Sequence, residues 1–223
     1  MMQVVASWSG GKDSCLACYK AVSQGFKVSH LLNLVNKDSG RCMSHGLNPK
    51  LIRAQAQAIK IPIVQRKLTW GTYEREFKKA VLEIKQTGAK GVVFGDVDLH
   101  EHKDWVDRVC KELGIKAIEP LWGADLEQLL AEFVNEGFEA IVVRAKADIF
   151  SEEWLGLKID ENFVKELREL KNKSNFHILG EAGEYHTFVT NGPLFKQRIR
   201  ILEADKFLKD GYWSLDIAKW KID

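Results

Sequence analysis

The sequence predicts an α/β protein built on a doubly wound parallel sheet, followed by a smaller α+β unit. Over the first 120 residues, short apolar segments rich in β-branched residues alternate with amphipathic segments of ten or more residues. Strands that alternate with helices pair in parallel through right-handed crossovers, and the helices then cover both faces of the sheet. Beyond Pro120 the strands become shorter and are separated by Gly and Pro. We therefore expect an N-terminal domain at 1–120 and a C-terminal domain at 121–223.

The elements of the first domain follow from periodicity and from capping residues. Apolar runs predict strands at 4–8, 28–35, 61–65, 91–94 and 116–118. Apolar residues at helical spacing predict helices that begin near residue 13 and continue at 49–60, 73–86 and 104–113. Asn48 is a good N-cap with Pro49 at the first helical position, and Gly88 and Gly114 end the two later helices. The polar segment 95–102 is expected to be a loop.

The second domain is predicted to mix helices with short strands. Amphipathic segments predict helices at 125–136 and 160–171. Apolar runs bounded by Gly and Pro predict strands at 138–144, 176–179, 186–190 and 197–204. These strands are too closely spaced for helical crossovers, so we expect antiparallel or mixed pairing.

Composition limits the classes of function. The 223 residues are 45% hydrophobic, enough for an ordinary core, and 33 basic against 31 acidic residues give a net charge of +2. No overall field favours direct binding of nucleic acid or an anionic membrane. The sequence has no apolar run of about 18 residues and no secretory signal, so we expect a cytoplasmic protein without a membrane partner. The sequence is compatible with either a monomer or a homo-oligomer.

The segment 4–14, VVASWSGGKDS, carries the first functional signal. Ser9, Gly10 and Gly11 break the first strand before a helix begins. Glycines let backbone N–H groups approach an anion closely, the helix N-terminus carries a partial positive charge, and Lys12 adds a full one. We therefore expect this loop to bind phosphate. It is not a Walker A loop, because the glycines are adjacent and do not fit GxxxxGK[ST].

The string SGGKDS at 9–14 resembles the pyrophosphate loop of the N-type ATP pyrophosphatases, whose signature is SGGxDS. Members of that superfamily cleave ATP between its α and β phosphates and leave AMP on a substrate oxygen. The resemblance implies a HUP-like sheet of strand order 3-2-1-4-5, which turns Gly95 and Asp96 towards the nucleotide. It implies that ATP is bound by Ser9, Gly10, Gly11, Lys12, Asp13, Ser14 and Gly95.

A second motif, GEAGEYHTFVTNGPLF at 180–195, places Glu181 and Glu184 beside Tyr185 and His186 in a glycine-flanked polar loop. Three shorter strings accompany the two motifs, namely GD at 95–96, PLW at 120–122 and WLG at 154–156. Together they resemble the diphthine–ammonia ligase family, whose second signature is close to GEGGEYET. The likeness runs in order along nearly the whole chain. It implies an ATP-dependent ligase that adenylates diphthine on translation elongation factor 2 and transfers ammonia to give diphthamide, AMP and pyrophosphate.

The resemblance also implies roles for individual residues. It implies catalytic roles for Lys12, Asp13, Asp96 and Glu184. It implies a substrate site formed by Glu181, Glu184, Tyr185 and His186. Triphosphate chemistry needs charge compensation, so Mg²⁺ is expected, with Asp13 and Asp96 as its ligands. The chain departs from the family signature at Ala182, where glycine is usual, and at His186, where an acid is common.

Free ammonium is the expected nitrogen donor, because two assigned domains leave no room for a glutaminase unit. Glu181 and Glu184 are the paired carboxylates expected to capture ammonium and accept its proton, with their loop folded over the nucleotide cleft. Lys12 is expected at the surface of the phosphate loop, as a point charge for the departing phosphates. Side chains at Gly10 and Gly11 are expected to clash with phosphate or to forbid the backbone angles.

Other patterns in the sequence have competing interpretations. Cys15-x-x-Cys18 lies in the first helix, where residues three apart share a face, so we favour core packing over a metal or redox site. DVDLHEH at 96–102 contains the residue types of a transition-metal site, but we favour a polar loop in which Asp96 alone lies near the phosphates. His45 is a weaker candidate for the nucleotide pocket. The alternative functions are an ATP-dependent RNA-modifying enzyme and a non-catalytic ATP-binding sensor.

Overall fold

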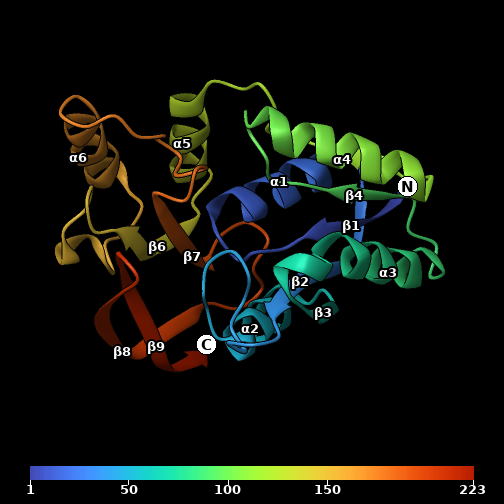
Figure 1. Cartoon of the computed structure of the whole chain (residues 1–223), viewed down its shortest axis with the longest axis horizontal. Coiled ribbons are helices and arrows are strands. Elements are labelled where there is room, and N and C mark those ends of the chain that lie inside the picture. Colours follow the sequence, from blue (N-terminus) through green and yellow to red (C-terminus); the bar gives the residue numbers. More distant parts are fainter.

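The computed structural model describes all residues, Met1–Asp223, and contains two sheets that lie side by side (Figure 1). The first sheet is parallel, has the order β3-β2-β1-β4-β5, and comprises β1 (Gln3–Ser7), β2 (Lys27–Asn36), β3 (Ile63–Leu68), β4 (Gly91–Val93) and β5 (Lys116–Ile118). The second is antiparallel, has the order β7-β6-β9-β8, and comprises β6 (Glu139–Lys146), β7 (Tyr185–Asn191), β8 (Ile199–Lys209) and β9 (Tyr212–Ile222). The predicted fold class and strand order are confirmed.

The helices cover both faces of the parallel sheet. Along β1, Val4 and Ala6 pack with α1 (Lys12–Ser23) and α2 (Pro49–Ile59). Val5 points to the other face and packs with α3 (Tyr73–Lys85) and α4 (His100–Leu113). The shorter elements are α5 (Leu126–Asn135), α6 (Glu161–Lys171) and the 3-10 turns η1 (Trp70–Thr72) and η2 (Glu152–Trp154). Alternate residues of a buried strand thus serve two separate layers of helices.

The larger hydrophobic cluster joins the two sheets. Its 45 buried residues include the sheet-facing sides of α1 and α2 and most of the second sheet with α5 and α6, whereas the cluster under α3 and α4 has 15. Phe188 on β7 is fully buried in the larger cluster. The core is therefore continuous between the two parts of the chain, and the division into domains at 1–120 and 121–223 stays a prediction.

Side-chain caps fix several helix starts as the sequence predicts. The Asn48 side chain accepts a hydrogen bond from the backbone N–H of Lys50, with Pro49 at the first helical position of α2. Asp125 caps α5 in the same way and Asp160 caps α6. Cys15 and Cys18 are buried on the sheet-facing side of α1 with no disulfide, which confirms their role in core packing.

Three local predictions are wrong. The helix α4 begins at His100 and not at residue 104, and the segment taken as a loop therefore includes its first turn. Its N-cap, Leu99, has no side-chain acceptor, so the sequence carries no capping signal there. The second predicted strand of the C-terminal domain, 176–179, is irregular backbone. Strand β9 was not predicted, although Asp210 and Gly211 both have positive φ in the turn that leads into it.

The irregular segment 176–179 forms no ladder because side chains bind its carbonyl groups. Lys171 Nζ donates to the Phe176 carbonyl, Lys12 Nζ to that of Leu179, and the Tyr185 hydroxyl to that of Ile178. Buried carbonyl groups need donors, and here side chains supply them where a neighbouring strand otherwise would.

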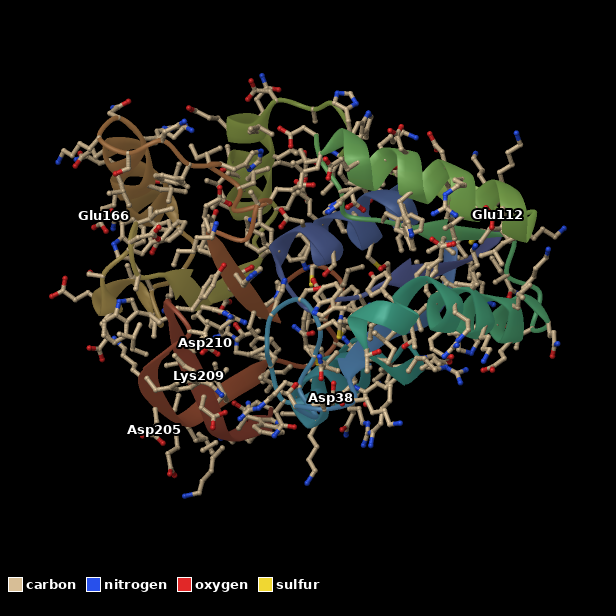
Figure 2. The ribbon with its side chains drawn as sticks, viewed as in Figure 1. Asp38, Glu112, Glu166, Asp205, Lys209 and Asp210 are labelled. Atoms are coloured by element: carbon tan, nitrogen blue, oxygen red, sulfur yellow. The ribbon has the colours of Figure 1, made fainter.

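Charged residues occupy the outside of the molecule. Figure 2 shows Glu112, Glu166 and Asp205 at its periphery, with side chains directed away from the body. Lys12 and Glu184 are the only charged side chains among the buried residues. None of the helices is both long and apolar enough to cross a bilayer. Buried charge is therefore confined to the region where the two sheets meet the phosphate loop.

The side chain of Gln55 joins three parts of this region. It is fully buried on α2. Its Oε1 accepts a hydrogen bond from the Trp8 indole over 3.0 Å, and its Nε2 donates to the carbonyls of Gly10 and Val189 over 2.9 and 2.7 Å. One amide thus holds the end of β1, the phosphate loop and β7 together, and no pattern in the sequence predicts this role.

We predict that Gln55→Met lowers the free energy of unfolding by roughly 2–4 kcal/mol, because it removes three hydrogen bonds and leaves buried polar groups without partners. Chemical denaturation measures the change. Gln57→Met, on the exposed face of the same helix, is the matched control and should leave the free energy within about 0.5 kcal/mol. Equal losses in the two variants would contradict this account of Gln55.

Candidate active site

A cavity of about 440 Å³ opens beyond the carboxyl ends of β1, β2 and β4. Its wall includes residues 7–9 after β1, 94–96 after β4, and 180–181 with 185–187 from the second sheet. Strands β1 and β4 are neighbours. From β1 the chain continues to β2 on one side, and from β4 it continues to β5 on the other side, so the strand order reverses between them. Ligands of doubly wound sheets bind beyond the strand ends at such a reversal, and the cavity has the volume of a typical small-molecule site.

The phosphate loop forms the floor of the cavity. Gly10 has a φ of +85°, which strains any other residue, whereas Gly11 has an ordinary φ of −88°. The Ser9 hydroxyl donates to the Ser14 hydroxyl over 3.1 Å, and both residues line the cavity. The backbone N–H groups of Asp13 and Ser14 donate to no protein atom. Two free amides at the start of α1 are suited to an anion.

Gly95 lies directly against the start of α1. A Cβ atom on Gly95 would lie 3.0 Å from the Ser14 backbone nitrogen and 3.0 Å from the Asp13 carbonyl carbon. Only a residue without a side chain therefore fits between the end of β4 and the phosphate loop without displacing one of them. This contact supports the expectation that Gly95 and Asp96 face the same site as the loop.

Lys12 lies elsewhere than expected. It is 3% exposed, and its ammonium group donates to Asp13 Oδ2 over 2.8 Å and to the Leu179 carbonyl over 2.5 Å. The same group lies 5.0 Å from the centre of the Tyr185 ring. The expectation of a surface side chain is wrong, because the segment 179–187 covers the loop and places the Leu179 carbonyl and the Tyr185 ring against Lys12. Lys12 still lines the cavity.

The two glutamates of the second motif point to different places. Glu181 lines the cavity, where its Oε1 accepts a hydrogen bond from the Val97 N–H over 2.9 Å. Burial, together with Asp13 and Asp96, raises the pKa of Glu181 to about 7. Glu184 is 5% exposed, and its Oε1 accepts from the backbone N–H of His177 over 2.9 Å. The structure therefore does not bring the two carboxylates together in the cavity.

The side chains of the polar segment 96–102 make contacts in three different places. His102 Nδ1 lies 3.0 Å from Asp96 Oδ1, and this pair lies within 4.8 Å of a Glu181 oxygen, measured between possible ligand atoms. Asp98 instead pairs with His177 Nε2 at 3.0 Å, and His100 packs edge-on against Trp122. The hydrogen bond to Asp96 raises the pKa of His102. Of this string, only Asp96 and His102 contribute to the cavity wall.

Asp13, Asp96 and Glu181 all line the cavity, and carboxylates are the oxygen ligands that Mg²⁺ prefers. Asp96 and Glu181, with His102, place possible ligand atoms within 4.8 Å of one another, whereas Asp13 Oδ2 is paired with Lys12. The mutual repulsion of these carboxylates, which helps to raise the pKa of Glu181, is what a divalent cation offsets. These residues therefore fit the ion.

His45 and His186 form a stacked pair on the cavity wall. Their ring centres lie 4.7 Å apart, and His45 Nδ1 donates to the Thr187 carbonyl over 2.9 Å. Burial lowers the pKa of His45 to about 4, and burial with the adjacent His45 lowers that of His186 well below its usual value. The site thus contains neutral imidazoles at pH 7. His186 stands where an acid is common in the family signature, so this wall carries no negative charge.

The backbone conformation at position 182 explains why alanine can replace the usual glycine there. Lys60 and Asp210 are the only residues other than glycine with positive φ, so Ala182 occupies backbone that an alanine adopts without strain. Gly180 and Gly183 on either side supply the positive φ angles of this loop. The replacement of the usual glycine therefore leaves the loop geometry intact.

The sequence interpretation missed part of the site. Thr187 Oγ1 accepts a hydrogen bond from the Lys12 backbone N–H over 2.9 Å, so a residue of β7 caps α1. Trp70 and Tyr73 stack with ring centres 5.8 Å apart, and Trp105 packs edge-on against Tyr73. All three aromatic residues line the cavity. The only available signal was the density of aromatic residues at 70–77, which also fits an amphipathic helix.

We predict that Gly11→Ala weakens ATP binding at least tenfold. Its Cβ would lie 2.2 Å from His45 Cε1 and 3.2 Å from the Thr187 carbonyl oxygen, so packing and not backbone angle makes a side chain unacceptable. Isothermal titration with ATP measures the change. Gly71→Ala, where nothing lies within 4 Å, is the control, and His45→Ala in the Gly11→Ala chain should restore part of the affinity. Full affinity in Gly11→Ala would exclude this loop as the phosphate site.

We predict that the protein loses stability between about pH 6.5 and pH 4 through His45. The folded pKa of about 4 lies below the ordinary 6.5, so in this range the unfolded chain binds a proton that the folded chain does not. The loss at pH 5 should reach about 2 kcal/mol. Denaturation at pH 7 and pH 5 should show a smaller loss for His45→Asn, with the exposed His100→Gln as control. The same slope in all three proteins would contradict the assignment.

Comparison with known proteins agrees with these features. A family model described as the diphthamide synthase N-terminal domain matches residues 2–117, and one described as the C-terminal domain of the same enzyme matches 125–221. A solved chain from Methanocaldococcus jannaschii, described as a predicted subunit of tRNA methyltransferase, is 20% identical with a TM-score of 0.47 over 86% of this chain and 98% of its own. That score supports no conclusion.

Curated relatives carry the same family name. The diphthine–ammonia ligase of Rattus norvegicus is 30% identical over 89% of this chain and 82% of its own length. The one from Schizosaccharomyces pombe is 30% identical over 92% of this chain, which spans 37% of that relative's length. The human protein of this name is 28% identical over 89% of this chain and 82% of its own. The chain therefore belongs to the diphthine–ammonia ligase, or diphthamide synthase, family.

Proposed function

We propose that this protein is an ATP-dependent amide ligase that adenylates the carboxylate of diphthine on elongation factor 2 and transfers ammonia to it, releasing AMP and pyrophosphate. One observation carries the proposal beyond family membership. The phosphate loop, with the free N–H groups of Asp13 and Ser14, opens into the same cavity as Glu181 of the second motif. A nucleotide phosphate and an acyl group therefore have room to meet there.

Binding of the departing phosphates is assigned to the loop. The amides of Asp13 and Ser14 are donors without protein partners at the cavity floor. The hydroxyls of Ser9 and Ser14 line the same floor and donate to Ser14 and to the Gly11 carbonyl in this structure. Gly10 keeps the backbone close enough for these contacts. The wall of Trp70, Tyr73 and Trp105 offers an aromatic face on which an adenine base stacks. The cavity thus has a donor-rich end for phosphate and an aromatic end for the base.

The chemistry has two displacement steps. A diphthine carboxylate oxygen attacks the α phosphorus, the bond from that phosphorus to the bridging oxygen breaks, and pyrophosphate leaves. Ammonia then attacks the acyl carbon, and the bond from that carbon to the AMP oxygen breaks. Mg²⁺, when held by Asp13 and Asp96, supplies compensation for phosphate charge. Glu181 is the carboxylate on the cavity wall to which the ammonium proton can pass, and Glu184, bonded to His177, holds the loop.

Ammonium and a cytoplasmic location belong to the same proposal. All four cysteines are free and buried, which suits a reducing compartment. The cavity wall contains none of the exposed, activated cysteines through which a glutaminase would act; Cys42, which lines it, is buried with a pKa raised to about 11. Free ammonium is therefore the donor that we assign.

The proposal is tested with elongation factor carrying diphthine, ammonium, Mg²⁺ and ATP labelled at the α phosphate. We expect labelled AMP, pyrophosphate and a mass decrease of about one unit on the factor, since –OH is replaced by –NH₂. ADP as the main product, or glutamine replacing ammonium with equal rate, would overturn it. Turnover of the nucleotide on RNA, or ATP binding with no turnover, would instead favour the RNA-modifying or the sensor alternative.

The same assay separates the two glutamates. Glu181→Gln should bind ATP normally and slow amide formation about 100-fold or more, because a neutral amide cannot accept the proton. Glu184→Gln should weaken the contact with the His177 N–H that holds the loop, and should therefore mainly lower the free energy of unfolding. Slower amide formation in Glu184→Gln with unchanged stability would return the catalytic role to Glu184, as the sequence alone suggested.

A further inference from the structure

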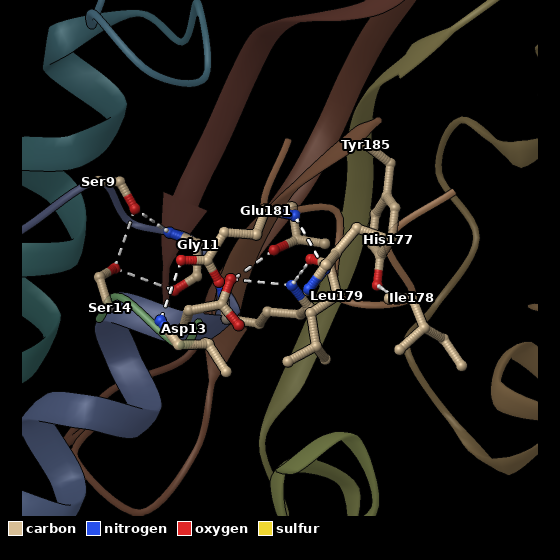
Figure 3. A network of polar contacts seen from close by, with 12 residues as sticks. Ser9, Gly11, Asp13, Ser14, His177, Ile178, Leu179, Glu181 and Tyr185 are labelled. Carbon is tan, nitrogen blue, oxygen red and sulfur yellow. Dashed lines mark hydrogen bonds and ion pairs between the residues drawn. The ribbon is translucent and has the colours of Figure 1, made fainter. Parts of the chain in front are cut away.

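The buried ammonium group of Lys12 is surrounded by three different kinds of partner. It contacts a carboxylate oxygen of Asp13 at 2.8 Å, the carbonyl oxygen of Leu179 at 2.5 Å, and the face of the Tyr185 ring at 5.0 Å. Figure 3 shows Asp13, Leu179 and Tyr185 in one network of polar contacts with Glu181 and His177. A carboxylate, a carbonyl and an aromatic face are the groups that bind ammonium ions in proteins.

We propose that Asp13 Oδ2, the Leu179 carbonyl and the Tyr185 ring form the binding site for substrate ammonium, which the Lys12 side chain fills in this structure and leaves when it turns to a bound triphosphate. The inference rests on the proposed ligase function. An alkylammonium group and NH₄⁺ share charge, size and N–H donors. A site that holds the first without water therefore has the chemistry to hold the second.

The proposed site does not depend on Lys12 for its shape. The Tyr185 hydroxyl donates to the Ile178 carbonyl over 2.9 Å, and the ring packs edge-on against Phe150 and Phe163. The Leu179 carbonyl belongs to the turn in which Gly180 N–H donates to the His177 carbonyl over 2.8 Å. These contacts remain when Lys12 moves. The site is therefore preorganised for a second cation.

Charge favours the exchange. Lys12 is the first residue of α1, beside the free amides that face the cavity floor, so a bound polyphosphate would attract its ammonium group. Its departure would leave Asp13 Oδ2 and the Leu179 carbonyl without the ammonium donor that they have in this structure, and Glu184 Oε2 already has no hydrogen-bond donor. Burial and the charges of Asp13 and Glu184 raise the pKa of Tyr185 well above its usual value, which places both charges near the ring. A small cation would restore the balance.

The exchange sets the order of binding. Ammonium has access to the site only after the bound nucleotide has drawn Lys12 away. The nitrogen donor therefore binds after ATP, when the substrate carboxylate can be activated. Glu181 lines the adjacent cavity. Sodium is smaller and holds its water more firmly, and the aromatic face of Tyr185 favours a larger, weakly hydrated cation.

Thallium(I) is a suitable probe because it has the charge and about the size of ammonium and gives an anomalous X-ray signal. Crystals of the whole chain are soaked in thallium acetate with and without an ATP analogue that has a methylene group between the α and β phosphates. We expect a peak between Asp13 and Leu179 in the wild type with the analogue only. Lys12→Met, of similar length but uncharged, should show the peak without the analogue.

Three outcomes would overturn the proposal: no peak in Lys12→Met, an equal peak in the wild type without the analogue, or no peak in the wild type with it. Lys20→Met on the same helix is the matched control and should behave as the wild type. Adding Asp13→Asn to Lys12→Met should lower the peak at least tenfold. If Lys12→Met does not fold, the two wild-type soaks still decide the question.

Kinetics provide the second measurement. Tyr185→Leu should raise the KM for ammonium about tenfold above that of Tyr185→Phe, because both variants lose the hydroxyl bond to the Ile178 carbonyl and only Tyr185→Leu loses the aromatic face. An unchanged KM for ammonium would contradict the site. Thallium at the site without amide formation would uphold the cation site and reject the ligase function, and amide formation without thallium would do the reverse.

Discussion

The docking of β7 onto the phosphate loop is the contact on which the rest of the site depends. Val189 N–H donates to the Gly10 carbonyl over 3.0 Å, and Thr187 Oγ1 accepts from the Lys12 N–H over 2.9 Å. Gln55 donates to the carbonyls of Gly10 and Val189 together. A loop that binds phosphate through its backbone must be held in one conformation, and here a strand from the other sheet holds it. The two parts of the chain therefore make one site.

That docking also explains the charges of the site. A covered loop excludes water, so Lys12 needs partners from the second motif and finds Leu179 and Tyr185. The same burial keeps His45 and His186 neutral. Charge beside the loop is thus concentrated in the ion pair of Lys12 with Asp13. The buried cation nearest the loop therefore already has partners within the chain.

The features that could be predicted from sequence are those written in local periodicity and capping. The parallel α/β sheet, the Asn48 cap and the packing of Cys15 belong to this group, whereas the strand order was implied by the resemblance to the N-type ATP pyrophosphatases. Asp210-Gly211 between two apolar segments is a hairpin signal from which β9 could have been predicted. The start of α4 and the burial of Lys12 could not be predicted. Each is decided by contacts between distant segments, because polar residues are compatible with an exposed helix face, an edge hairpin or a loop until a neighbour fixes their surroundings. The separation of Glu181 from Glu184 has the same cause.

The four cysteines have a consequence for the chemistry of the folded chain. Each is buried without a disulfide, and burial raises the pKa of the thiols, to about 12 for Cys18 and about 11 for Cys42 and Cys110. Thiolate is the species that reacts with alkylating agents and peroxides, and it is scarce at neutral pH under these conditions. The native molecule is therefore inert towards oxidants that damage exposed thiols. Modification of its cysteines marks molecules that have opened.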